Sequence, residues 1–345
     1  MQKRLKVLAI ETSCDETAAA VVSGIRSGTG ISDVRIHSNV VASQAAVHAR
    51  FGGVFPEVAA REHVKTIMPT IRLALREGLG SDEPAILRTL NALAVTVGPG
   101  LIGSLLVGVE TANALALGVK LPLVGVNHMA GHFYSTFVSA PRRFPVLALL
   151  VSGGHTQLVW SEQQNQFKIL GSTRDDAVGE AFDKAAALLG LPYPGGSHIE
   201  RLARDAQQPT PFPVTRLATF AFSYSGLKTA LRRELEKNPD PTPEERANLA
   251  AGFQRAALEQ LVWQTSSARF RYRPATVVVG GGVSINHVLQ EKLTQALSPL
   301  SVYFPDPALT GDNAAMIGVA ALWQTLKEPS LPRYDLEAEA SLQLA

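Results

Sequence analysis

Short apolar runs separated by polar turns dominate the hydropathy pattern of this chain. Residues 5–22 comprise an apolar run, a polar turn and a second apolar run, and this order predicts two strands joined by a hairpin. Residues 144–160 repeat the order, with Ser152-Gly153-Gly154-His155-Thr156 as the polar turn. The chain therefore carries two copies of one strand–turn–strand unit.

A second pattern, an apolar strand followed by a glycine turn and an apolar helix, also occurs twice. Residues 93–117 contain it with a turn that begins Gly98-Pro99-Gly100, and residues 275–297 contain it with the turn Gly280-Gly281-Gly282. Turn glycines allow a backbone to approach a phosphate closely, and the N-terminus of the following helix favours an anion. Two similar halves that face a shared cleft describe the duplicated α/β fold of actin, hexokinase and the Hsp70-like chaperone ATPases (ASKHA), in which a nucleotide lies between two lobes.

This duplication divides the chain into two predicted lobes. We assign residues 1–118 to an N-terminal lobe, completed by a C-terminal helix over 313–327, and residues 119–312 to a second lobe that carries most of the candidate site. Residues 328–345 are expected to form an irregular tail. Further helices are predicted over 56–78, 179–189, 223–237 and 242–270.

Composition narrows the class of protein. A chain of 345 residues with 46% hydrophobic and 18% charged residues is typical of a soluble globular protein of two domains. Cys14 is the only cysteine, which excludes an intrachain disulfide and favours a reducing, cytoplasmic setting. No stretch offers the roughly 20 uncharged apolar residues of a membrane helix, so no membrane partner is expected.

Two histidines four residues apart suggest a metal site. Asn127 is placed as the N-cap of a helix, so that His128 and His132 lie one turn apart on the same face. Two imidazoles in this arrangement can bind one divalent ion. Met129 stands where the zinc-protease motif has its glutamate, so a protease's general base is missing. Spacing alone does not decide between a metal site and two ordinary helix histidines that bind no metal.

The net charge of +2 permits a nucleic-acid partner without requiring one, so local basic clusters matter more. Short clusters are usually solvated surface, and no RNA-binding motif accompanies them. The last of them has Phe270 and Tyr272 interleaved. The four clusters are Lys3-Arg4-Lys6, Arg142-Arg143, Arg232-Arg233 and Arg269-Arg271-Arg273.

Eight separate stretches between about residues 5 and 325 resemble one family closely. It is the TsaD/Gcp family of tRNA N6-adenosine threonylcarbamoyltransferases, once labelled O-sialoglycoprotein endopeptidases. The stretches are Ile10 to Thr17, Ser43-Gln44 with His48 to Gly53, Gly98 to Ser104, Asn127-His128 to His132, Ser152 to Thr156, Gly179 to Lys184, Phe222 to Lys228 and Gly311 to Met316. Tyr224 stands where the family usually has phenylalanine, and Ser197 to Glu200 varies a stretch that often carries aspartate, which leaves the role of Glu200 open.

The resemblance implies a third metal ligand and a substrate. Asp312 would join His128 and His132 in a two-histidine, one-carboxylate site, although aspartate at this position also suits a helix N-cap. The family implies iron(II), with zinc(II) as the alternative. The implied substrate is threonylcarbamoyl-AMP, and the implied acceptor is N6 of the adenosine 3′ of the anticodon in tRNAs that read codons beginning with A.

The resemblance also implies roles for residues around the substrate. The stretch Leu150-Val151-Ser152-Gly153-Gly154 would hold its phosphate and carbamoyl oxygens, and Asp183, Gly196 and Asn286 match positions that bind the nucleotide. Candidates for proton transfer are Glu11, Asp15 and His155, each of which can equally serve to hold its hairpin. Lys228 can offset phosphate charge.

The family further implies protein partners, namely a paralogous TsaB-type subunit and a TsaE-type ATPase that share the contact with tRNA. The apolar-rich helix that begins at Pro56 is the expected docking face. Two other functions stay open at this point. One is a nucleotide-binding scaffold without chemistry of its own, and the other is a metalloprotease, which Met129 disfavours.

Overall fold

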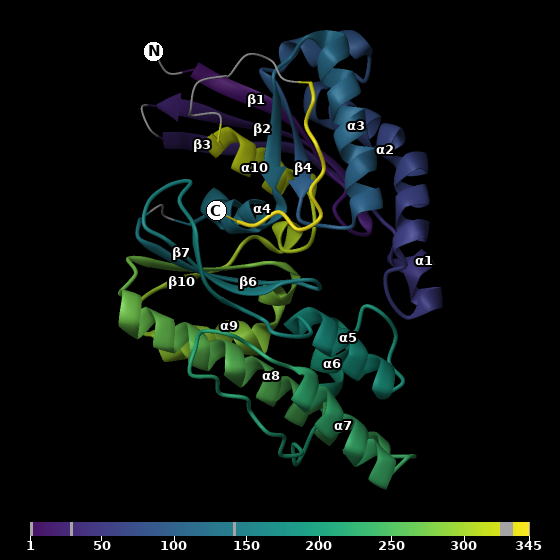
Figure 1. Cartoon of the computed structure of the whole chain (residues 1–345), viewed down its shortest axis with the longest axis vertical. Coiled ribbons are helices and arrows are strands. Elements are labelled where there is room, and N and C mark those ends of the chain that lie inside the picture. The colour runs from purple at the N-terminus through teal and green to yellow at the C-terminus, as the bar shows by residue number, and fades with distance from the viewer. Residues whose placement is uncertain (1–2, 28–29, 141–142, 325–333, 345) are drawn as a thin grey trace. The chain divides into compact units, whose positions relative to one another are not determined.

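The computed structural model describes residues 3–27, 30–140, 143–324 and 334–344. The chain is divided into two compact units. The first comprises Met1–Val47, Val54–Ser139 and Gly311–Leu344, and the second comprises His48–Gly53 and Ala140–Thr310. Figure 1 shows the helices and strands of both units.

The first unit is built on a five-stranded sheet with strand order β3-β2-β1-β4-β5. Strands β1 to β3 are antiparallel, whereas β4 and β5 run parallel to β1. The strands are β1 (Lys3–Glu11), β2 (Glu16–Ser27), β3 (Gly30–Ser43), β4 (Ala92–Gly98) and β5 (Leu123–Asn127). The helices are α1 (Ala45–His48), α2 (Pro56–Leu79), α3 (Ile102–Val119), α4 (His128–Ser135) and α10 (Ala314–Gln324). Short 3-10 turns occur at η1 (Ala49–Phe51), η2 (Pro84–Thr89) and η3 (Thr136–Val138).

Alternation along β1 explains the layers of this unit. Leu8 and Ile10 belong to a core shared with α2 and α3, whereas Ala9 points toward Gly318 of α10 on the opposite face. The sheet therefore lies between α2 and α3 on one side and α10 on the other. Helix α3 is long and apolar enough to cross a membrane by length and composition alone. Its buried Val109 packs in this core, so it is a core helix here.

The second unit repeats the strand order of the first. Its sheet has the order β10-β9-β6-β7-β8, with β6, β7 and β8 antiparallel and β9 and β10 parallel to β6. The strands are β6 (Val146–Val151), β7 (Thr156–Ser161), β8 (Lys168–Ser172), β9 (Thr276–Gly280) and β10 (Val302–Tyr303). The helices are α5 (Val178–Leu188), α6 (Gly196–Ala203), α7 (Ser225–Lys237), α8 (Pro243–Tyr272) and α9 (His287–Leu297), with 3-10 turns η4 (Gly282–Ile285) and η5 (Pro307–Leu309).

The duplication predicted from the sequence is thus confirmed strand by strand. Each sheet has a central hairpin followed by two parallel strands, and the predicted helices over 56–78, 179–189, 223–237 and 242–270 are present. β5 and α4 lie in the first unit because β5 pairs in parallel with β4, although the sequence assigned residues 119–139 to the second lobe. Part of the predicted helix over 313–327 lies outside the described residues.

Residues 334–344 of the tail contain no helix or strand and pack against the first unit. The backbone N–H of Glu339 donates to the Val97 carbonyl at 2.7 Å, and the side chain of Asn113 exchanges hydrogen bonds with both backbone groups of Leu336 at 3.0 and 3.2 Å. A side chain at Gly98 would collide with the Glu339 carbonyl. The tail therefore covers the end of β4 and the start of its glycine turn.

Candidate functional site

Helix α4 begins where the sequence predicts it. The Asn127 side chain accepts hydrogen bonds from the backbone N–H groups of Met129 at 2.9 Å and Ala130 at 3.3 Å, which makes it the N-cap. His128 and His132 consequently lie one turn apart, with ring centroids 4.8 Å apart. The N-cap prediction is confirmed, and it orients both imidazoles toward the same side of the helix.

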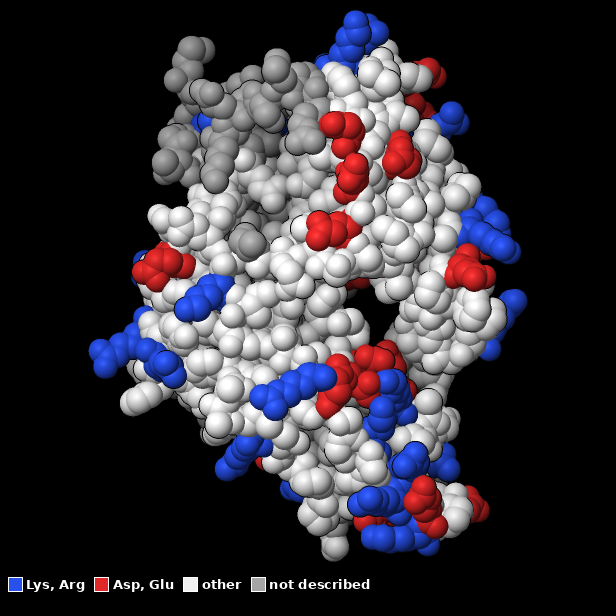
Figure 2. Space-filling model, in the orientation of Figure 1, with Lys and Arg blue, Asp and Glu red and all other residues white. Residues whose placement is uncertain are grey.

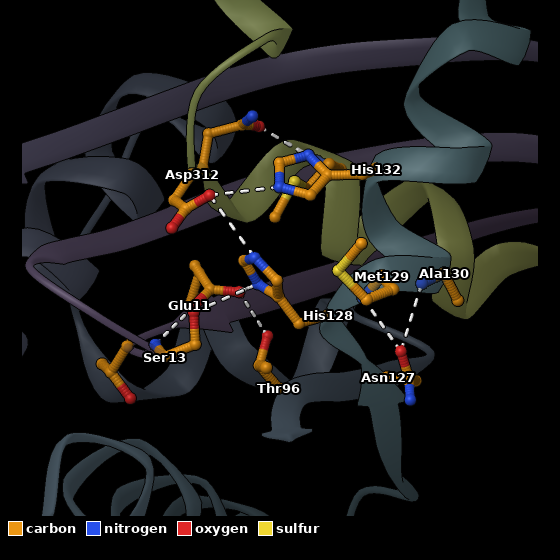
Figure 3. A network of polar contacts seen from close by, with 12 residues as sticks. Glu11, Ser13, Thr96, Asn127, His128, Met129, Ala130, His132 and Asp312 are labelled. Atoms are coloured by element: carbon orange, nitrogen blue, oxygen red, sulfur yellow. Dashed lines mark hydrogen bonds and ion pairs between the residues drawn. The ribbon is translucent and has the colours of Figure 1, made fainter. Parts of the chain in front are cut away.

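Asp312 lies directly beside the two imidazoles (Figure 3). Its Oδ1 is 3.4 Å from His128 Nε2 and 3.2 Å from His132 Nε2, and the three ligand atoms lie within 4.8 Å of one another. Atoms that bind one ion tetrahedrally at about 2.1 Å are about 3.4 Å apart, so the two distances from Asp312 to the histidines suit a shared metal. The described residues thus include a three-ligand set that fits a divalent ion.

The cap of the last helix differs from the sequence-based expectation. Asn313, and not Asp312, caps α10, because the Asn313 Oδ1 accepts a hydrogen bond from the Met316 N–H at 3.0 Å. Gly131 of α4 lies against Met316 and Ile317 so closely that a Cβ would be 2.8 Å from the Ile317 side chain. This close packing places the carboxylate of Asp312 next to α4 and leaves it available to a metal.

Glu11 holds the other side of His128. Its Oε2 lies 3.1 Å from His128 Nδ1 and accepts a hydrogen bond from the Thr96 hydroxyl at 2.5 Å, while its Oε1 accepts from the Ser13 N–H at 2.5 Å. Glu11 and Thr96 are completely buried. A carboxylate on Nδ1 favours the tautomer whose Nε2 is free to bind a metal. These contacts suit an orienting group better than a general base that must reach a substrate.

Charge around the three ligands favours a cation. Burial lowers the pKa of His128, but the carboxylates of Asp312 and Glu11 outweigh burial and hold that pKa well above its usual value of 6.5. Burial raises the pKa of Asp312, yet His128 brings it well below 3.8. The carboxylates of Asp312 and Glu11 thus favour a positive charge at His128, as a bound cation would supply.

Two adjacent acidic residues, Asp15 in the β1–β2 turn and Glu16 at the start of β2, lie close to this cluster. Asp15 is buried, and burial, then Asp15 and Asp312, raise the pKa of Glu16 to about 10. Glu16 is therefore protonated at neutral pH. Glu16, Ser13 and Thr96 were not among the predicted site residues. A threonine inside the apolar strand β4 is the one sequence signal that pointed to a buried polar contact there.

The turn after β6 in the second unit is compact and open to solvent. The backbone of Ser152 donates to the His155 carbonyl at 2.8 Å, and the Ser152 hydroxyl accepts from the His155 N–H at 3.2 Å. Gly153 and Gly154 are exposed, with open space where a side chain would be. Leu150 and Val151 are buried in β6 and anchor the turn.

Residues predicted to bind the nucleotide lie around this turn. The α5 backbone at Gly179 donates to the Ser152 carbonyl at 3.2 Å, and Asp183 of the same helix accepts from the Gly195 N–H at 2.6 Å. Gly196 follows, with open space over its Cα. The structure thus brings Ser152, Asp183 and Gly196 together through α5.

Three other residues considered for substrate binding, Asn286, Lys228 and Glu200, form hydrogen bonds or ion pairs within the second unit. The Asn286 amide caps α9 by accepting from the Leu289 N–H at 3.0 Å and donates to the Gln254 side chain at 3.1 Å. Lys228 forms an ion pair with Asp176 at 2.8 Å. Glu200 lies 3.1 Å from the ring of His287 at the start of α9. Each of these side chains helps to hold the helices around the turn.

Comparison with solved structures defines the class of protein. The fold is similar to full-length HypF in its phosphate- and nucleotide-bound form, with a TM-score of 0.59 at 12% identity, covering 94% of this chain and 56% of HypF. It is also similar to the activator of 2-hydroxyisocaproyl-CoA dehydratase from Clostridium difficile, with a TM-score of 0.51 at 13% identity, covering 94% and 96%. The chain therefore has the duplicated α/β fold of the ASKHA type, and its first unit carries a candidate metal centre.

Sequence comparison defines the family. The TsaD profile, described as tRNA N6-adenosine threonylcarbamoyltransferase, matches residues 35–319. Proteins of that name from Moorella thermoacetica and Trichlorobacter lovleyi are 47% and 48% identical, over 94% and 91% of this chain and 94% and 90% of their own lengths. The one from Halalkalibacterium halodurans is 45% identical over all of this chain and 98% of its own. This chain belongs to the TsaD family of tRNA N6-adenosine threonylcarbamoyltransferases, as the resemblance predicted.

Proposed function

We propose that this chain transfers the threonylcarbamoyl group of threonylcarbamoyl-AMP to N6 of the adenosine 3′ of the anticodon, in tRNAs that read codons beginning with A, and that it does so in the cytoplasm. The observation that carries the proposal is the cluster of His128, His132 and Asp312 in a chain that matches this family over most of its length. A zinc protease of the H-E-x-x-H type would need a glutamate after the first histidine, and the buried Met129 stands there.

For the metal we propose iron(II), with zinc(II) as the alternative. Two imidazoles and one carboxylate that leave positions open are a set that suits iron(II), whereas magnesium prefers oxygen ligands. His128, His132 and Asp312 would hold the ion, and Glu11 would orient His128. A bound ion would supply Lewis acidity toward an acyl or phosphate oxygen.

The reaction needs positioning more than covalent help. The adenosine N6 attacks the carbamoyl carbon, the bond from that carbon to the phosphate oxygen breaks, AMP leaves with the electron pair, and N6 loses one proton. Because the donor is already activated, orientation and charge stabilisation supply most of the rate. We assign the backbone of Ser152-Gly153-Gly154 to the phosphate and carbamoyl oxygens, Asp183 to a ribose hydroxyl and Gly196 to the base. Asp15 and His155 stay candidates for accepting the proton.

We further propose that a TsaB-type paralogue docks on α2 and that a TsaE-type ATPase joins the complex. Val64 and Met68, one turn apart on α2, are 65% and 41% exposed, and Leu73 is 41% exposed. Such apolar exposure on one helix favours a protein partner. Val64→Glu with Met68→Glu should abolish copurification with the paralogue, whereas Leu188→Glu, at another exposed apolar position, should not. Equal recovery from both variants would refute this face.

Reconstitution tests the function. The purified chain is combined with threonine, bicarbonate, ATP, unmodified tRNA and the partner enzymes, and the tRNA nucleosides are then analysed. His128→Ala and Asp312→Ala should lose both bound metal and modified adenosine while circular dichroism stays unchanged. Asp306→Ala, which removes a carboxylate six residues before Asp312 in the sequence that caps only a 3-10 turn, should keep both. Wild-type activity of His128→Ala or Asp312→Ala would rule out the metal assignment.

A further inference from the structure

The C-terminal end of α8 carries an unusual surface. Phe270 is 86% exposed, the most exposed large apolar side chain among the described residues, and it stands between Arg269 and Arg271. An open pocket of about 530 Å³ is lined by Arg269, Phe270, Arg273, Pro274, Pro299 and Leu300. These residues and Arg271 are called the α8 patch below. Figure 2 shows Lys and Arg side chains on the part of the surface where α8 ends in Figure 1.

The positive charge of the α8 patch is not neutralised locally. No Asp or Glu occurs between Glu259 and Glu291 in the sequence. Within the described part of the chain, the three arginines of the patch have no ion pair. Two of the other basic clusters are partly paired, since Arg4 pairs with Asp33 and Arg232 pairs with Glu236. Uncompensated guanidinium groups favour a polyanionic ligand.

Stabilisation of helix α8 explains only part of this clustering of arginines around an exposed phenylalanine. Arginines in the last turn of a helix interact favourably with its dipole, which applies to Arg269 and Arg271. Arg273 is the C-cap beyond the helix, and a dipole gives no reason to expose a phenylalanine. Tyr272, two residues further, packs its ring 5.3 Å from Trp160 and 5.9 Å from Phe220, so the local fold does bury aromatic rings where it can.

We infer that the α8 patch binds tRNA, with the arginines on backbone phosphates and Phe270 stacked on an unpaired base. An exposed aromatic ring within a basic surface is the combination that binds single-stranded nucleic acid. The inference rests on the proposed function, which makes tRNA the substrate.

The place of the α8 patch in the second unit makes it a contact remote from the reacting atoms. It precedes the N-terminal end of β9, whereas the Ser152 turn follows the C-terminal end of the parallel strand β6. Six residues of strand separate these two edges by about 20 Å. The patch therefore contributes to the affinity for tRNA and leaves the chemical step unchanged.

Binding of unmodified tRNA to the full-length chain, alone and with its partner proteins, tests the inference without turnover. Arg269→Gln, Arg271→Gln and Arg273→Gln combined should weaken binding and reduce the slope of log affinity against log salt by about 2 to 3, about one for each phosphate contact. Phe270→Ala should weaken binding about 5- to 150-fold with an unchanged slope, since stacking releases no counterions. In the transfer assay, both variants should raise KM for tRNA and keep kcat.

A matched control removes the same charge elsewhere. Arg232→Gln, Arg233→Gln and Lys237→Gln combined neutralise three basic residues on α7 of the same unit and should leave tRNA affinity and slope within twofold of wild type. Equal losses in both triple variants would overturn the inference by showing a general charge effect. Wild-type tRNA binding by the α8 variants, with or without loss of a protein partner, would also overturn it while leaving the transferase proposal intact. Failure of transfer by a chain whose tRNA binding depends on the patch would instead overturn only the proposed function.

Discussion

Replacing Glu11 with glutamine tests whether this carboxylate sets the tautomer of His128. Glu11 accepts hydrogen bonds from the Ser13 N–H and the Thr96 hydroxyl, and its Oε2 lies 3.1 Å from His128 Nδ1. A glutamine amide offers one accepting atom and one donating group in the same space. Since the Ser13 N–H can only donate, the amide oxygen should face it and the NH₂ group should face His128. That arrangement favours the tautomer with a proton on Nε2, which cannot bind a metal.

The expected loss of metal affinity follows from these contacts. Removing the partner that orients a metal-binding histidine typically weakens metal binding about 10- to 100-fold, which corresponds to about 1.4 to 2.7 kcal/mol. The change in fold stability should be smaller than a simple count of lost hydrogen bonds suggests. A hydrogen bond is weakened, but a fully buried charge is removed as well.

Anaerobic titration of the metal-free protein with iron(II) and zinc(II) measures the effect directly. Asp175→Asn serves as the control, because Asp175 also accepts several hydrogen bonds but takes them from Ser223, Tyr224 and Ser225 and not from the metal ligands, so metal affinity should not change. Thr96→Val should weaken binding only a few fold, because it removes one donor to Glu11 and keeps the charge. Wild-type metal affinity in Glu11→Gln would refute the proposed orienting role.

Three further outcomes are expected. Neighbouring carboxylates outweigh burial and raise the pKa of His128, so below that pKa a metal ion must displace the proton of the imidazolium. Metal affinity should therefore fall about tenfold for each pH unit as the solution is acidified. Calorimetry in two buffers should show the release of about one proton for each metal ion bound. Burial raises the pKa of Asp175, but hydrogen bonds from the start of α7 lower it overall, so its stabilisation is complete above about pH 4 and is lost as the pH falls through the lowered value. Asp175→Asn should therefore cost about 1 kcal/mol in urea unfolding at pH 7, and this cost should shrink as the pH falls below about 4. Asn113→Leu, which breaks both hydrogen bonds to Leu336, should cost about 1 to 3 kcal/mol in the same assay, and an unchanged unfolding midpoint would show that the tail does not stabilise the first unit.

Local patterns were sufficient for much of the fold. The hairpin of residues 5–22 and the long helix that begins at Pro243 follow from apolar periodicity and helix-capping residues, which act within a few positions of the chain. The same holds for Asn127 as the N-cap of α4. Strand β3 was missed because its buried and exposed positions do not alternate regularly, and the pairing with β2 includes register shifts.

The metal centre shows where sequence reasoning ends for this protein. The sequence by itself determined that His128 and His132 share one face of a helix, because that depends only on the geometry of one turn. Resemblance to a family, and not spacing, supplied Asp312. Only the tertiary structure decided that Asn313 takes over the helix cap, and that Glu11 lies beside His128 although 117 residues separate them. The physical reason is that a ligand set gathered from β1, α4 and the start of α10 depends on how the sheet and its helices pack, and no local propensity encodes that packing.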